Sequence, residues 1–160
     1  MMTVRQVLAQ CDVFSGLNEA ELEKISSSAL EREYEAGATV FQEGDAAQEL
    51  LVLQEGKVAL QMTLPRVAAE ASRRMTVDAV NKNEIIGWSA IVEPYIYTMS
   101  AICLQKTKAL SISGTKLRTL MQENQMVGYL VLQGLIRVVA SRLNETRQLL
   151  VSERLLTGGK

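Results

Sequence analysis

The feature that most constrains the fold of this 160-residue chain is a change in the period of its apolar residues at about residue 116. Between residues 31 and 113, short apolar runs at 39–41, 50–53 and 58–62 alternate with glycine-bearing turns, which is typical of β-strands. From residue 116 the apolar residues follow a helical period, and no proline interrupts the segment 129–156. The sequence therefore predicts a β domain followed by helices.

Four glycines, Gly37, Gly44, Gly56 and Gly87, lie between the strand-like runs. Glycine adopts the positive φ of tight turns most easily and asparagine is the next most tolerant, so we expect these positions and Asn83 to form turns.

A short helix is expected near the N-terminus. Asn18 followed three residues later by Glu21 has the spacing of a capping box, in which each side chain accepts from the other residue's backbone N–H. Leu22, Ile25 and Leu30 are then predicted to face inward.

The last helix carries two apolar stripes. One, which we call the helix seam, alternates spacings of four and three residues as in a coiled coil. It consists of Leu132, Ile136, Val139, Leu143 and Leu150, with Thr146 as a polar member. The second stripe, Val131, Leu135 and Val138, occupies only the first half of the helix. This pattern favours packing on the β domain first and on the same helix of a second copy throughout; the alternative is one amphipathic helix that packs only on its own domain.

The composition excludes most catalytic designs. The chain has no histidine, which removes Ser-His-Asp and Cys-His catalysis and histidine metal triads. Cys11 and Cys103 are too few and too far apart for a disulfide scaffold or a CxxC site, and we expect both to be buried apolar residues in a reducing compartment. We therefore expect no enzyme activity, no metal and no cofactor.

Charge and hydropathy limit the partners. The net charge is -1, whereas nucleic-acid-binding domains usually carry a basic excess. Arg66, Arg73 and Arg74 lie in a polar segment, 65–74, that is predicted to be a solvated hairpin tip. The N-terminus lacks a signal-peptide core, and no stretch is expected to reach the ~18 apolar residues of a membrane span, so a cytoplasmic protein is expected.

Several short pieces, taken in order and spacing, resemble the cyclic nucleotide-binding domain of the catabolite activator protein (CRP/FNR) family. These pieces are residues 14–17, Gly37 with 41–45, 51–53 leading to 56–58, and 85–87. The resemblance implies a mainly β fold with flanking helices: a double-stranded β-helix, or jelly-roll-like β-roll, followed by a long dimerisation helix.

The resemblance also implies a layout for the whole chain as one domain. N-terminal helices occupy 1–30, the β-roll 31–113 with a phosphate-binding cassette at 85–100, and C-terminal helices 116–156. The family commonly adds a DNA-binding domain, and we expect none here if the chain is complete at residue 160, whereas a truncated chain would restore that possibility. By itself the chain is therefore not expected to bind nucleic acid.

The cassette of this chain departs from the family pattern. In the family, a Gly-Glu pair is followed after about ten residues by Arg and then Ser or Thr; the Glu accepts from the ribose hydroxyl and the Arg contacts the cyclic phosphate. Counted without gaps from Gly87, Trp88 replaces the Glu, Tyr97 replaces the Arg, and Thr98 is retained. A single-domain branch of the family is similar in carrying this Gly-Trp-Ser and Tyr-Thr variant.

Ligand binding is expected to change accordingly. Each lost hydrogen bond to a charged group costs about 1.5–3 kcal/mol, so two losses weaken cAMP or cGMP binding roughly a hundredfold to ten-thousandfold. We expect Ser89 to cap the short cassette helix, which continues through Ala90. The family's adenine-contacting pair falls on Thr146 and Arg147, where Thr146 is either a ligand contact or a tolerated polar residue of the helix seam.

Three interpretations of the aromatic cassette remain open: its rings fill the former nucleotide cavity, it binds another small ligand, or it keeps residual cyclic nucleotide binding.

The favoured function is a non-catalytic regulatory or sensory module that acts as a homodimer on a protein partner. The alternatives are the ligand-binding half of a CRP/FNR-type transcription regulator and a sensor of a small ligand other than cAMP. A cupin-type enzyme is disfavoured because its metal site would need histidines.

Overall fold

The computed structural model describes residues 2–64 and 73–158. Residues 65–72, which include most of the predicted hairpin tip with Arg66, lie outside the described residues, and Arg74 begins a strand. The helices are α1 (Val4–Ala9), α2 (Glu19–Ser26), the 3₁₀ helix η1 (Trp88–Ile91), α3 (Gly114–Glu123) and α4 (Gln125–Leu156). The strands are β1 (Leu30–Tyr34), β2 (Thr39–Phe41), β3 (Glu49–Glu55), β4 (Val58–Thr63), β5 (Arg74–Val80), β6 (Ile85–Ile86), β7 (Ser100–Cys103) and β8 (Thr107–Ser113).

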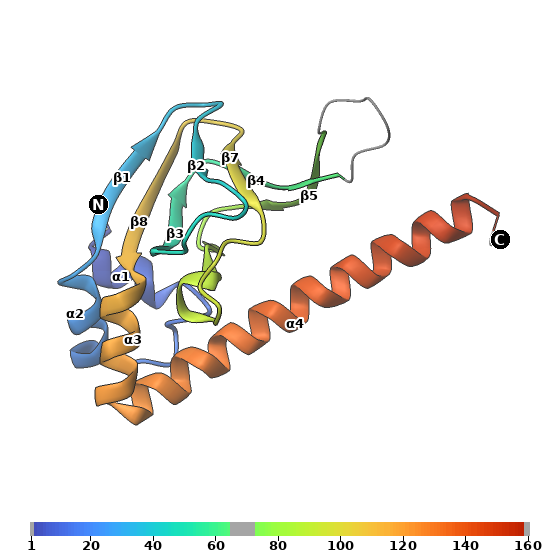
Figure 1. The fold of residues 1–160 in the computed structure, drawn as a ribbon. Coiled ribbons are helices and arrows are strands. Elements are labelled where there is room, and N and C mark those ends of the chain that lie inside the picture. Colours follow the sequence, from blue (N-terminus) through green and yellow to red (C-terminus); the bar gives the residue numbers. More distant parts are fainter. Residues whose placement is uncertain (1, 65–72, 159–160) are drawn as a thin grey trace.

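The described strands form two four-stranded antiparallel sheets, one in the order β1-β8-β3-β6 and the other in the order β2-β7-β4-β5 (Figure 1). Apart from the consecutive strands β4 and β5, neighbours in each sheet are not consecutive in sequence, as in a jelly roll: Leu51 of β3, for example, pairs with Ser111 of β8 and Ile86 of β6. The predicted fold class, mainly β with flanking helices and a long C-terminal helix, is confirmed.

Strand β3 shows how the core is built. Leu50 and Val52 lie in a cluster with residues of the helices, whereas Leu51 and Leu53 lie in a second cluster with residues of the other sheet. Successive strand residues point to opposite faces, so an uninterrupted apolar run is buried on both sides. The first sheet is therefore the middle layer, between the helices and the second sheet.

The predicted turns and the N-terminal helix are mostly confirmed. The four glycines at 37, 44, 56 and 87 all have positive φ, and so does Asn83, at 70°. Asn18 and Glu21 form both bonds of a capping box, and Leu22 and Ile25 are buried. The prediction for Leu30 is wrong: it begins β1 and is 61% exposed, because the helix ends at residue 26 and the helical period no longer applies.

Helix α4 starts on the core and then leaves it. Val131 and Leu135 are buried and Val138 is partly buried, so the second apolar stripe packs on the domain as predicted. The distal half of α4 extends beyond the β-roll, on the same side as β5 (Figure 1).

Within the described residues α4 is long and apolar enough to cross a membrane, by length and composition only, so the expectation that no segment reaches that composition is wrong. One such helix is weak support for a span, because helices that pack on a core pass the same test.

Gly134 allows α4 to contact the N-terminal turn, and we expect Gly134→Ala to destabilise the protein. A Cβ there would lie 2.7 Å from the Asp12 carbonyl oxygen and 2.8 Å from the Val13 Cα, both backbone atoms that cannot rotate away. Alanine gains about 1 kcal/mol over glycine within a helix, whereas overpacking costs about 1–3 kcal/mol and more where backbone must move. We expect the clash to dominate and to lower the free energy of unfolding by about 1–2 kcal/mol, measured by urea denaturation.

Gly16→Ala is the matched control for that measurement. Its Cβ would meet only the Leu130 side chain, at 3.6 Å, so the free energy of unfolding should change by less than about 0.5 kcal/mol. A Gly134→Ala variant more stable than the wild type would show that α4 does not approach the turn this closely.

Candidate functional site

The cassette connects β6 to β7 and begins with a glycine that the local geometry requires. Gly87 has φ 81°, and a Cβ on it would lie 2.7 Å from the Glu49 carbonyl oxygen and 3.3 Å from the Tyr97 ring. Both the backbone conformation and the space therefore exclude larger residues. The 3₁₀ helix η1 follows directly.

The prediction that Ser89 caps the cassette helix is wrong. η1 spans Trp88–Ile91, so Gly87 is its N-cap and Ser89 lies inside it, and among the described residues no side chain caps it. Ala90 is buried, and its carbonyl oxygen accepts a hydrogen bond from Arg118 of α3. The cassette helix is therefore held from its far side by α3.

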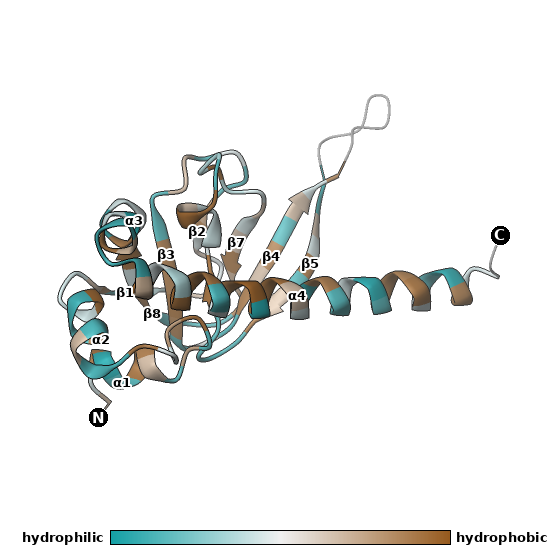
Figure 2. Ribbon diagram, turned by 90° about the horizontal axis from the view of Figure 1, so that it is seen from below, coloured by the Kyte–Doolittle hydropathy of each residue, from teal (hydrophilic) through white to brown (hydrophobic). Residues whose placement is uncertain are grey.

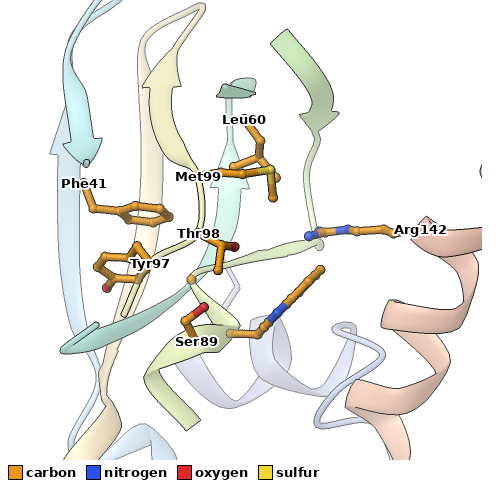
Figure 3. Close-up of a pocket in the computed structure, with 9 residues that line it drawn as sticks. Phe41, Leu60, Ser89, Tyr97, Thr98, Met99 and Arg142 are labelled. Atoms are coloured by element: carbon orange, nitrogen blue, oxygen red, sulfur yellow. The ribbon is translucent and has the colours of Figure 1, made fainter. Parts of the chain in front are cut away.

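Tyr97, at the position of the family's phosphate-binding Arg, is part of the core. The side chain is 6% exposed, and its ring stacks on Phe41 of β2 with a centroid distance of 3.8 Å and an interplanar angle of 11° (Figure 3). The hydroxyl donates to the Glu49 carbonyl oxygen at 2.6 Å and accepts from the Glu49 backbone N–H at 3.1 Å. Burial raises the pKa of the Tyr97 hydroxyl, so the phenol is neutral at physiological pH.

Trp88, at the position of the family's ribose-binding Glu, is partly buried and carries a cation on its face. The guanidinium carbon of Arg142 lies 4.7 Å from the centroid of the Trp88 ring. Thr98, the one retained cassette residue, is exposed and lines the same pocket as Trp88 and Ser89. The structure thus brings together most of the predicted cassette residues.

Arg142 of α4 is a residue of this site that the sequence analysis missed. Its side chain is only 13% exposed and reaches from α4 to the cassette (Figure 3). It donates to the Ile85 carbonyl oxygen at 2.6 Å, and its Nε lies 3.8 Å from a carboxylate oxygen of Asp78. Burial lowers the pKa of Arg142, an effect that the nearby Asp78 carboxylate opposes. The sequence shows that Arg142 lies in the last helix next to the seam residue Leu143. Its spacing gives no sign that it, and not Arg137 of the same helix, would reach the cassette.

The cavity left in the cassette is small, about 20 Å³. It is lined by Phe41, Leu60, Gly87, Trp88, Ser89, Tyr97, Thr98, Met99 and Arg142. A cavity of this volume holds about one water molecule, whereas small-molecule pockets occupy about 300–1,000 Å³. The aromatic side chains and Arg142 occupy most of the space around the cassette.

Thr146 does not line the cassette cavity. It is exposed on α4, and its hydroxyl donates to the Arg142 carbonyl oxygen of the same helix at 2.8 Å. Within this chain Thr146 therefore lies outside the cassette cavity, and its role as a ligand contact or as a polar residue of the helix seam stays a prediction.

The helix seam is only partly covered in this chain. Val139 packs partly on the core, whereas Leu132, Ile136, Leu143 and Leu150 are all exposed. Apolar residues continue along α4 past the end of the β-roll (Figure 2). Single exposed apolar residues are common on protein surfaces, but four aliphatic side chains aligned along one helix form a continuous apolar strip of the kind that marks an interaction surface.

The cysteines offer no reactive thiolate. Both are buried and free, and burial raises the pKa of the Cys11 thiol to about 11, which keeps it protonated at neutral pH. Within residues 2–64 and 73–158 no group of three or more Cys, Asp or Glu side chains is placed to hold a metal ion.

A jelly roll that carries a short helix between two strands and a long helix after the last strand defines a class of β-roll regulatory domains. Residues 31–124 match the cyclic nucleotide-binding domain family, and the chain belongs to this family. The resemblance inferred from the sequence is thus confirmed, and the family is regulatory and generally non-catalytic.

Among curated proteins, a CRP-like cAMP-activated global transcriptional regulator of Mycobacterium tuberculosis is 23% identical over 141 residues, which are 88% of this chain and 59% of that protein. The chain thus spans about three fifths of the length of this relative.

Two crystal structures share the fold. One, from Geobacter metallireducens GS-15, has a TM-score of 0.76 at 26% identity and is aligned over 89% of this chain and 99% of its own. The other, the N-terminal domain of a transcriptional regulator from Streptomyces coelicolor A3(2), has a TM-score of 0.67 at 27% identity, over 90% and 94%.

Proposed function

We propose that this chain is a non-catalytic regulatory module whose cassette is filled by its own side chains, and that it acts as a cytoplasmic homodimer on a protein partner. We propose residues 1–160 as one such module. The observation that carries the proposal is the buried Tyr97, stacked on Phe41 and bonded to the Glu49 backbone beside a cavity of only about 20 Å³.

The chemistry of the cassette opposes an anionic ligand at the family's phosphate position. Tyr97 offers no positive charge, and its hydroxyl already donates to a backbone carbonyl. Arg142 does carry a charge, but it is already bonded to the Ile85 carbonyl and lies on Trp88. A cyclic nucleotide would have to displace these contacts as well as create room, and both costs reduce affinity.

The exposed helix seam supports the dimer. Pairing two copies of α4 would remove Leu132, Ile136, Leu143 and Leu150 from water in each chain, at roughly 25 cal/mol per Å² of apolar area. The spacing of four and three suits a two-stranded coiled coil, in which both helices present the same residues.

A second candidate function is the ligand-binding half of a transcription regulator. It is favoured by the relative from Mycobacterium tuberculosis, a global transcriptional regulator of which this chain spans 59%. Intact-mass measurement of the endogenous protein decides between the two: a product near 17.6 kDa favours the module, and a product longer by a DNA-binding domain favours the regulator.

We expect cAMP to bind weakly. Two lost charge-assisted contacts at about 1.5–3 kcal/mol each would weaken a micromolar site to a dissociation constant of about 100 µM or more. Titration calorimetry measures this directly, and Trp88, the only tryptophan, reports on the site by its emission. A cAMP dissociation constant in the micromolar range or below would overturn the proposed closed cassette, and cGMP titrated in parallel tests whether the base changes the result.

A further inference from the structure

We infer that Arg142 is a positioning residue that keeps this domain closed: its guanidinium lies on Trp88, holds α4 against the β-roll without a ligand and closes the cassette. This inference rests on the proposed function, because it identifies the group that keeps the cassette closed. We call the contacts of Arg142 with Trp88, Ile85 and Asp78 the Arg142 anchor.

The anchor joins four elements of the chain. Arg142 comes from α4, the Ile85 carbonyl that it bonds at 2.6 Å belongs to β6, and Asp78, at 3.8 Å, belongs to β5. Trp88 opens the cassette helix η1 directly after β6. A single side chain therefore fixes the position of α4 relative to the cassette and both neighbouring strands.

Arg142 also separates two cavities. On one side is the cassette cavity of about 20 Å³, and on the other a polar cavity of about 360 Å³ between α4, the N-terminal turn and the β5–β6 connection. Of the residues that the structure describes, Arg142 is the one that lines both cavities. The larger cavity is in the size range of small-molecule sites, so truncating Arg142 would give the cassette the space that it lacks.

The strength of these contacts follows from their burial. A guanidinium that is largely out of water interacts more strongly with an aromatic face and with a carbonyl than an exposed one does. The planar guanidinium can stack on the Trp88 ring and at the same time donate an N–H to the Ile85 carbonyl oxygen beside it. A lysine ammonium, which is not planar, cannot make both contacts equally well. Arg142→Lys should therefore restore the anchor only in part.

Arg137 is the matched control within the same helix. It lines the larger cavity too, but it is exposed, and among the described residues it makes one long hydrogen bond, of 3.4 Å, to the Asp12 carbonyl oxygen. Arg137→Ala removes the same charge and the same side-chain volume without touching Trp88.

The test uses the full chain and two measurements. In Arg142→Ala, acrylamide should quench Trp88 with a constant about twofold larger than in the wild type, because the guanidinium no longer covers the ring. Amide exchange over residues 139–146 of α4 should become about tenfold faster relative to residues 127–135, because the anchor no longer resists local opening. Arg137→Ala should leave both readouts at wild-type values, and Arg142→Lys should lie between.

The outcomes separate this inference from the proposed function. If folded Arg142→Ala shows wild-type quenching and exchange, Arg142 does not close the cassette, and the proposal of a closed module still stands on Tyr97. If the wild type binds cAMP at micromolar concentration, the closed module itself is wrong, whatever Arg142 does. If Arg142→Ala does not fold, Arg142→Met decides by the same measurements: it keeps the apolar stem, so unchanged exchange and quenching overturn the anchor and faster exchange supports it.

Discussion

Leu143→Glu is expected to dissociate the proposed homodimer into monomers. Leu143 is 48% exposed in the isolated chain, and its place in the helix seam puts it against the partner helix in the proposed dimer. Two-fold symmetry introduces the carboxylate twice, opposite its own copy, in a seam otherwise formed by aliphatic residues and Thr146, so the two charges are desolvated and repel each other. At about 2 kcal/mol or more per buried charge, the dimer dissociation constant should rise about a thousandfold or more, which sedimentation velocity over a concentration series would detect.

Val151→Glu is the matched control for this experiment. Val151 is similarly exposed, at 56%, but it follows Leu150 by one residue and so lies about 100° around the helix from the seam. The Val151→Glu substitution adds the same charge to the same helix and should leave the proposed dimer intact. A dimer that survives Leu143→Glu would reject the seam, and equal dissociation by both variants would show that the charge acts without regard to position.

The fold could be predicted from the sequence because each strand carries its own signal. The run at 39–41 is β2 to the residue, since a glycine turn lies on each side of it. Gly37 and Gly44 mark those turns by a backbone conformation that few other residues adopt. Leu30 was assigned wrongly because an apolar residue four positions past a helix end fits a helical period and a strand start equally well.

The cassette could be predicted only in part. The family resemblance, counted from Gly87, put Trp88 and Tyr97 in one cassette, and both line the same cavity. Whether their rings fill that cavity depends on residues far away in sequence. Phe41, which stacks on Tyr97, comes from β2, and Arg142 comes from α4. These contacts arise when separate elements pack together, and no local pattern encodes them.

The prediction that Ser89 caps η1 was wrong for a related reason. Ser89 has the right chemistry for an N-cap, but the helix begins one residue earlier because Gly87 already supplies the turn in a left-handed conformation. The anchoring of this short helix then comes from Arg118 and Arg142, two side chains contributed by other helices.

Tyr97→Ala is expected to cause a large loss of stability. It removes a buried ring that stacks on Phe41 and two hydrogen bonds to the Glu49 backbone. Replacing a buried aromatic residue by alanine costs about 3–5 kcal/mol, which is a large part of the roughly 5–15 kcal/mol that stabilises a typical domain. Urea denaturation followed by the emission of Trp88 and by circular dichroism should show this loss as a lower midpoint.

Tyr97→Phe separates the ring from the hydroxyl. It keeps the stacking on Phe41 but leaves the carbonyl and N–H groups of Glu49 without their partner, which costs about 1–3 kcal/mol. The expected order of stability is therefore wild type, then Tyr97→Phe, then Tyr97→Ala. If Tyr97→Ala costs less than about 1 kcal/mol, the ring is not a packed part of the core in solution, and the cassette opens often enough to admit a ligand. That result would remove the main support for a self-filled cassette and would favour the interpretation in which the aromatic residues line a site for another small molecule.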